Sequence, residues 1–168
     1  MTLIVEDGTG LSTAESFCSI ADATSYHAKY GNEAWLSQPD SEREIHLRRA
    51  TQFLEAEFRG RWKGIRVKTE QALAWPRYDV CDEDEAWVSS SAVPVQVRDA
   101  TAILALISAT ETLVPDLEAG AVKRERVKVG DIEEETEYVG AKRERKSYTL
   151  AEQMLRPLLE PAGRLYRA

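Results

Sequence analysis

The sequence predicts a mainly α-helical fold: a small bundle of about four helices with a long inter-helix loop, a β-hairpin and a C-terminal helix and tail. Apolar residues recur at helical spacing between residues 41 and 58. Residues 100–110 carry no charge and are apolar on every side, as in a helix that is buried all round. Residues 122–139 carry oppositely charged runs on either side of Gly130-Asp131, which is typical of a β-hairpin.

The composition favours one folded domain spanning residues 1–168. Apolar residues make up 43% of the chain and charged residues 30%, which is ordinary for a folded protein and too apolar for wholesale disorder. The formal net charge of −7 disfavours a dedicated nucleic-acid binder, because phosphate binding needs a basic surface. Cys18 and Cys81 lack the spacing of a zinc site or a redox motif, and we expect two buried, reduced thiols.

The N-terminal residues 1–18 are rich in loop-forming glycine and serine, so an extended arm is expected there. A first helix is predicted over residues 20–30. Ser19 is a suitable N-cap for it, and Gly31 is a suitable stop.

A second helix is predicted from Asp40 or Ser41 to Phe58. Ser41 followed three residues later by Glu44 has the pattern of a capping box. Gly60 follows the helix as a stop. The apolar stripe that should face the core is made of Leu47, Ala50, Leu54 and Phe58.

Residues 59–93 form a long inter-helix loop with no clear helical or strand pattern. The loop holds Trp62, Trp75 and Trp87. Because loops of this length are uncommon in compact domains and tryptophan rarely stays in water, we expect the loop to pack on the helices or on another subunit.

Two further helices complete the bundle. One is predicted from Pro94 to about Leu113 and should be the central core helix, because its middle is apolar on all sides. The last is predicted over residues 149–159, where Pro157 limits or kinks it.

In the predicted hairpin, residues 122–139, the turn at Gly130-Asp131 sets basic residues opposite acidic ones. Such pairs stabilise a hairpin, so neither charged run has to be a binding tail. The predicted pairs are Lys128 with Glu133, Arg126 with Glu135, and Arg124 with Glu137.

Catalytic patterns are not found in the sequence. His27 and His46 lie on separate predicted helices without metal-ligand spacing, and there is no nucleophile elbow, phosphate loop or dinucleotide fingerprint. The acidic run at residues 79–85 lacks the spacing of a calcium loop and is interpreted as a solvated loop. We therefore expect no enzyme activity, no metal and no cofactor.

The basic, aromatic stretch at residues 59–77 has three interpretations. Cations beside exposed aromatic rings suit single-stranded nucleic acid. Alternatively, the tryptophans are packed and the arginines pair with acidic surface. The third interpretation, which we favour, is a subunit contact in which the basic stretch of one copy meets the acidic loop of another. The residues predicted at this interface are Arg59, Arg61, Trp62, Lys63, Trp75, Arg77, Asp82, Asp84 and Glu85.

A series of short motifs resembles the head–tail connector (head-completion or adaptor) proteins of long-tailed bacteriophages, a family whose members also carry the label DnaT-like single-stranded-DNA-binding protein. The likeness covers nearly the whole chain and rests on the order of the motifs. They are Val5-Glu6-Asp7-Gly8, Ser16-Phe17, Ser19-Ile20-Ala21-Asp22-Ala23, Tyr26-His27, Gly31-Asn32, Trp35, Leu47-Arg48-Arg49-Ala50-Thr51, Gln71-Ala72-Leu73-Ala74-Trp75-Pro76-Arg77 and Pro94.

The resemblance implies a subunit of an oligomeric ring, a dodecamer, in the neck of the virion, made in the host cytoplasm. Such a ring joins the portal protein to a tail-side stopper or tail-terminator protein, and genomic DNA passes through its lumen without specific binding. An acidic lumen would repel phosphates, in keeping with the net charge of −7. Portal contact is assigned to the C-terminal segment 149–168, through Met154, Leu155, Leu158, Leu159, Arg164 and Tyr166. The alternative function is a DnaT-like module that binds single-stranded DNA.

Overall fold

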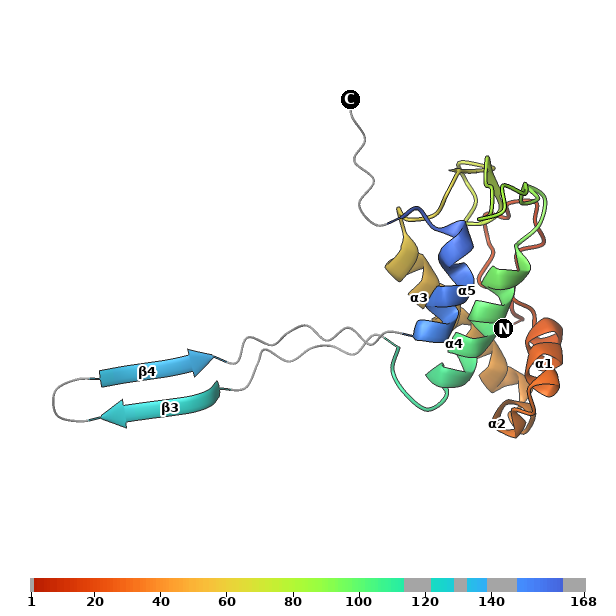
Figure 1. Cartoon of the computed structure of the whole chain (residues 1–168). Helices are drawn as coiled ribbons and strands as arrows, with labels where there is room; N and C mark the ends of the chain where they lie inside the picture. Colours follow the sequence, from red (N-terminus) through yellow and green to blue (C-terminus); the bar gives the residue numbers. More distant parts are fainter. Residues whose placement is uncertain (1, 114–121, 129–132, 139–147, 162–168) are drawn as a thin grey trace, which may run out of the picture. The chain divides into compact units, whose positions relative to one another are not determined.

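The computed structural model of the chain describes residues 2–113, 122–128, 133–138 and 148–161. The chain forms two compact units, one of residues 1–113 with 148–168 and the other of residues 114–147. The first unit is helical and the second contains a two-stranded hairpin (Figure 1). The predicted mainly α fold is confirmed.

Helices dominate the first unit. Its helices are α1 (Ile20–Lys29), α2 (Glu33–Leu36), α3 (Asp40–Phe58), α4 (Val95–Ser108) and α5 (Thr149–Leu155), followed by the 3-10 turn η1 (Arg156–Leu158). Two short strands, β1 (Ile65–Arg66) and β2 (Arg77–Tyr78), pair antiparallel in the loop between α3 and α4. The short helix α2 was not predicted, because a single turn leaves no periodic pattern in the sequence.

The start of each of the first two long helices can be compared with its predicted cap. Ser19 caps α1 as predicted, since its hydroxyl accepts a hydrogen bond from the amide of Asp22 at 3.0 Å. The predicted capping box of α3 is wrong. The helix already begins at Asp40 after Pro39, so Ser41 lies inside it, and Glu44 pairs with Arg48 instead.

Helix α4 is the central helix of the first unit, as the sequence predicted. It packs against α1, α3 and α5, and its buried residues come from several sides of the helix. It ends at Ser108, five residues before the predicted end at Leu113. The last predicted helix also stops early, because Pro157 takes part in the 3-10 turn that follows α5.

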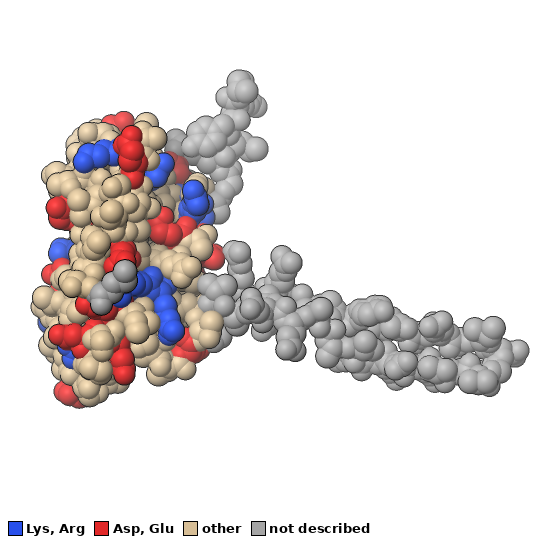
Figure 2. Space-filling view, turned by 180° about the vertical axis from the view of Figure 1, so that it is seen from behind, with Lys and Arg blue, Asp and Glu red and all other residues tan. Residues whose placement is uncertain are grey.

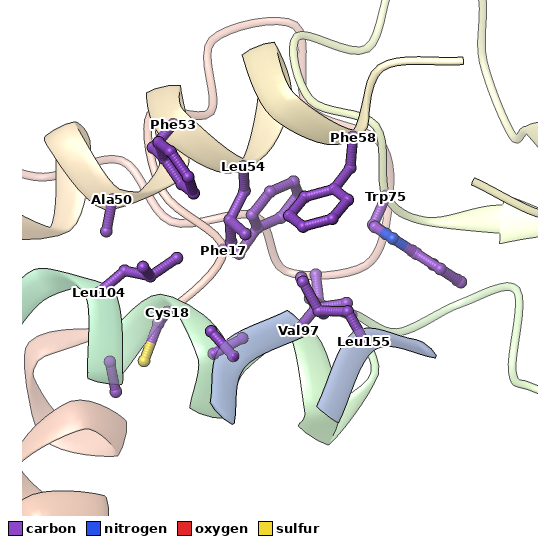
Figure 3. Packing of buried hydrophobic residues seen from close by; sticks show 14 of the residues in the cluster. Phe17, Cys18, Ala50, Phe53, Leu54, Phe58, Trp75, Val97, Leu104 and Leu155 are labelled. Atoms are coloured by element: carbon purple, nitrogen blue, oxygen red, sulfur yellow. The ribbon is translucent and has the colours of Figure 1, made fainter. Parts of the chain in front are cut away.

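The hydrophobic core lies between α3, α4 and α5. In Figure 3, Leu54 and Phe58 of α3 face Val97 of α4 and Leu155 of α5. Phe17, from the N-terminal segment, is fully buried in the same cluster. Burial of each of these side chains contributes roughly 1.5–3 kcal/mol to folding.

The N-terminal segment folds back onto the first unit instead of extending from it. The buried carboxylate of Glu6 accepts hydrogen bonds from the amides of Gly8, Gly10 and Leu11 at 2.8–3.0 Å. Gly8 has a φ of +97°, and a side chain there would collide with the backbone of Ser91. The prediction of an extended arm did not take into account that Glu6 supplies the acceptors for these loop amides.

The second unit contains the predicted hairpin, formed by β3 (Val122–Lys128) and β4 (Glu133–Tyr138). The backbone register matches the prediction, and the predicted turn at Gly130-Asp131 lies outside the described residues. Three basic positions face three acidic ones, and the paired residues are Arg124 with Glu137, Arg126 with Glu135, and Lys128 with Glu133.

His27 connects α1 to α4 inside the core. Its Nε2 lies 3.0 Å from the carbonyl oxygen of Ala102, and its Nδ1 lies 3.0 Å from the side-chain amide of Asn32. The carbonyl can only accept, so Nε2 donates to it and Nδ1 accepts from Asn32. Both nitrogens are thus satisfied in the neutral ring, and burial lowers the pKa of His27 below its ordinary value of 6.5.

The first testable prediction concerns stability against pH. Below a pH of about 6.5 the unfolded chain binds a proton at His27 that the folded chain resists, so the free energy of unfolding should fall as the pH falls through this range. In His27→Gln this dependence should become shallower, although the variant is less stable at pH 7. Urea unfolding between about pH 5 and 7.5 measures both slopes. Equal slopes for the two proteins would contradict the assignment.

Candidate protein-interaction surface

The loop between α3 and α4, residues 59–93, lies at one end of the first unit (Figure 1). Its framework is the β1–β2 pair, in which Ile65 stands opposite Tyr78. Gly64 allows this approach, because its φ is +68° and any side chain would collide with the carbonyl of Tyr78. The loop is therefore an ordered structure whose exposed and buried residues can be distinguished.

Two of the three loop tryptophans lie in the core. Trp75 is fully buried and Trp62 is 5% exposed. Their ring centroids are 5.7 Å apart in an edge-to-face arrangement, and the ring centroid of Phe58 also lies 5.7 Å from that of Trp62. The faces of both indoles are covered by the chain itself, so Trp62 and Trp75 offer no stacking surface to a base or to a second subunit.

Two of the predicted interface cations are also used within the chain. The guanidinium of Arg77 donates to the carbonyls of Gly64 at 2.6 Å, Lys63 at 2.7 Å and Ala74 at 3.2 Å. The ammonium of Lys63 donates to the carbonyls of Cys81 at 3.0 Å and Pro157 at 2.7 Å. Arg77 satisfies three carbonyls of the loop, and Lys63 joins a carbonyl of the loop to one of the 3-10 turn η1, so the role of both cations in this structure is architectural.

In the most specific motif of the sequence, residues 71–77, polar side chains also bind backbone groups of the loop. The buried amide of Gln71 donates to the carbonyls of Leu73 and Pro76. The carboxylate of Glu55 on α3 accepts from the amide of Ala74 at 2.7 Å, and burial raises the pKa of Glu55. The motif therefore fixes the loop to α3.

The exposed part of the loop contains the remaining charged residues. Arg59 and Arg61 are exposed and make no ion pair with any described residue, although Arg61 lies 5.4 Å from the ring centre of Phe58. On the acidic side, Oδ1 of Asp82 accepts from the amides of Asp84 and Ala86, each at 2.9 Å, and so holds a tight turn. Trp87 follows this turn with 74% of its surface exposed.

Trp87 is the residue that the interface prediction missed. The sequence placed it in the loop beside Trp62 and Trp75, and composition alone does not separate an exposed indole from a buried one. The available signal was its position two residues after the four acidic residues 82–85, which favours solvent over core.

A groove of about 560 Å³ opens beside the turn, between the end of α3 and the segment from α5 to Pro161. Phe58 and Leu159 supply apolar surface to it. The charged residues that line it are Arg61, Lys63, Arg156, Glu83, Glu152 and Glu160. Glu83 and Arg156 form an exposed ion pair at 3.6 Å across it, so one acidic residue of the turn faces a cation of its own chain.

The C-terminal residues proposed for portal contact divide into three groups. Leu155, Leu158 and Leu159 are buried against the chain's own core, whereas Met154 is only half-buried. The exposed apolar side chain of this helix is Leu150, which is 58% exposed. Arg164 and Tyr166 lie outside the described residues.

Within the described part of the chain, no three of the histidine, cysteine and carboxylate side chains gather as potential metal ligands. Cys18 is buried, and burial raises the pKa of its thiol to about 12, while Cys81 is only partly buried, in contrast to the prediction. None of the helices in these residues has the length and apolar character needed to cross a membrane.

The whole chain, residues 1–168, matches the family described as "Putative DnaT-like ssDNA binding protein". The chain belongs to this family. No curated protein and no solved structure matches the chain. The DnaT-like part of the predicted resemblance is thus confirmed, and the connector part stays a prediction.

For this DnaT-like chain, the loop contacts lead to a second prediction. Arg77→Ala should lower the free energy of unfolding by about 1.5–3 kcal/mol, because three carbonyls lose a charged donor. Arg61→Ala is the matched control. Its side chain is exposed, so its effect should stay within about 0.5 kcal/mol. Chemical denaturation of both variants measures the difference, and comparable losses would contradict the architectural role of Arg77.

Proposed function

We propose that this protein is a structural subunit that works through protein contacts, as a head–tail adaptor in the neck of a bacteriophage. In this role copies of the chain form a ring that joins the portal protein of the capsid to a tail-side stopper or terminator protein. Genomic DNA passes through the ring without specific binding, and no catalytic step is involved.

The observation that carries the proposal is which of the loop tryptophans are buried and which is exposed. Trp62 and Trp75 are buried against each other, and the exposed Trp87 follows the acidic residues 82–85 after one alanine. Carboxylates beside an indole repel phosphates, whereas an exposed tryptophan is typical of a protein–protein contact. The accessible aromatic surface therefore suits a protein partner better than DNA.

The distribution of charge supports the same role. The face drawn in Figure 2 carries lysine and arginine interspersed with aspartate and glutamate, without one continuous basic surface. In the second unit, the register sets the basic positions of β3 opposite the acidic positions of β4. Together with a net charge of −7, this pattern favours a conduit that DNA slides past.

The order of the sequence motifs supports the adaptor in particular. The resemblance to phage connector proteins includes the stretch 71–77, whose polar contacts fix the loop to α3. In an assembly subunit such a motif would serve to present the exposed residues of a loop in a constant arrangement. The portal protein and the dodecameric state belong to this proposal.

A second candidate function is binding of single-stranded DNA, which the description of the family favours. The surface that fits it best is the β1–β2 pair, where the exposed Tyr78 stands opposite Ile65 and the exposed cation Arg66 follows Ile65 on the same strand. Single-strand sites combine exposed aromatic rings with cations.

The third prediction tests the adaptor. Mixed with the portal protein encoded in the same phage genome, the purified chain should form a complex larger than either component, as measured by light scattering and negative-stain images. Met154→Ala should weaken this complex about fivefold or more, because a half-buried apolar contact of α5 is lost. Gln153→Ala is the control on the same helix. A chain that stays monomeric and ignores the portal would exclude the proposal.

The fourth prediction separates the two functions. Fluorescence anisotropy of a labelled oligothymidine at low salt should stay flat as the chain is added, because the phosphates meet no continuous basic surface. The DNA-binding alternative instead requires saturable binding that weakens steeply with salt and is lost in Arg66→Ala or Tyr78→Ala. The second result would replace the adaptor with a DNA-binding module.

A further inference from the structure

The hairpin of the second unit is a sheet of only two strands. Among the described residues, β3 and β4 pair with each other and with no further strand, so the outer edge of each is left without a partner. Backbone amides and carbonyls along such an edge are a template for another strand. An isolated two-stranded hairpin is only marginally stable in water. Further strands on its two edges would supply the missing pairing.

The sequence of the hairpin offers few apolar residues whose burial could stabilise it instead. The apolar residues of β3 and β4 are Val122, Val127 and Tyr138, and all the others except Thr136 are charged. A hairpin of this composition depends on backbone hydrogen bonds and on cross-strand pairs of opposite charge. Both kinds of interaction are gained again with each additional strand.

The charges of the hairpin are separated by strand. β3 carries four basic residues and one acidic residue, whereas β4 carries four glutamates and no basic residue. Edge strands commonly carry charge that keeps them from pairing with other chains. Here the two edges carry opposite charge, so each edge is repelled by a copy of itself and attracted by the other edge of a second copy.

The register shows which edges of two copies are compatible. Within the hairpin, positions 124, 126 and 128 of β3 stand opposite positions 137, 135 and 133 of β4, and alternate positions share one face of the sheet. Pairing β3 with a second β3 on that face would set basic positions opposite one another, and pairing β4 with a second β4 would oppose glutamates. Like charges directly opposite each other are destabilising. Pairing β4 with the β3 of another copy repeats the acid–base pattern of the hairpin itself.

We infer that the outer edge of β4 in one copy pairs antiparallel with the outer edge of β3 in a second copy. This inference rests on the proposed function, because it assigns a contact by which the subunits of the ring associate. The two edges are different surfaces of one chain, so the contact is heterologous and can repeat from copy to copy. Rotation about a ring axis keeps every β3 in one direction and every β4 in the other, so each contact stays antiparallel. A closed ring of such hairpins is a barrel, which leaves no edge unpaired.

A full chain with exchanged hairpin charges tests the inference. The exchanged chain combines Arg124→Glu, Arg126→Glu and Lys128→Glu with Glu133→Lys, Glu135→Lys and Glu137→Lys, which preserves the opposite-charge pairs of the hairpin and the net charge. Exchanged chains again offer an acidic edge to a basic one, so their self-association should match that of the unaltered chain. Between exchanged and unaltered chains like charges meet, so this mixed association should be at least about tenfold weaker.

Energy transfer between chains labelled with two dyes measures the mixed association over a range of concentrations, with and without the portal protein. The control is Glu83→Arg with Arg156→Glu, which reverses an exposed ion pair of the first unit and also preserves the net charge. This control should associate with the unaltered chain as readily as the unaltered chain does with itself. Circular dichroism should show all three chains folded.

A salt titration of the unaltered chain needs no variant. Its self-association should weaken several-fold from low to high salt, because the opposite charges at the contact are screened. Association that does not respond to salt would overturn the inference.

The remaining outcomes separate the two proposals. Mixed association as strong as self-association overturns the edge pairing, and so does a folded exchanged chain that fails to self-associate where the unaltered chain succeeds. An unaltered chain that binds the portal protein but never associates with itself overturns the edge pairing alone. If the unaltered chain neither associates nor binds the portal, the adaptor proposal falls as well.

Discussion

The burial of Trp75 is the constraint on which the loop end of the molecule depends. Its indole packs edge-to-face on Trp62, which in turn packs on Phe58 at the end of α3. The backbone around these rings would leave carbonyls unpaired in the interior, and the side chains of Arg77 and Gln71 satisfy them. Aromatic burial and carbonyl satisfaction thus require each other, which explains why cations and tryptophans alternate in this stretch of sequence.

This arrangement also explains which parts of the fold the sequence could predict. Helices α3 and α4 follow from apolar spacing, and the hairpin register follows from alternating charges, because both patterns depend on local periodicity. The structure of the loop interior does not follow from any such periodicity. A cation that binds backbone carbonyls, such as Arg77, has the same sequence signature as a cation on the surface, and only the tertiary structure separates them.

The candidate site, too, was predicted from the sequence only in part. The sequence placed Arg61 and Asp84 at an interaction surface, and both are exposed, whereas it also placed Trp62 there, which is buried. Trp87 was missed because the loop contains three tryptophans and its sequence does not show which of them is exposed. Burial of an aromatic ring depends on contacts between segments far apart in the chain, such as the bridge between Trp62 and Leu159 in the C-terminal segment.

The ammonium group of Lys63 links two segments of the chain mechanically. Lys63 holds the carbonyl of Cys81, at the base of the acidic turn, and the carbonyl of Pro157, in the segment after α5. A displacement of either segment strains the same two hydrogen bonds. Together with the ion pair between Glu83 and Arg156, these bonds transmit force applied at the C-terminal segment to the turn.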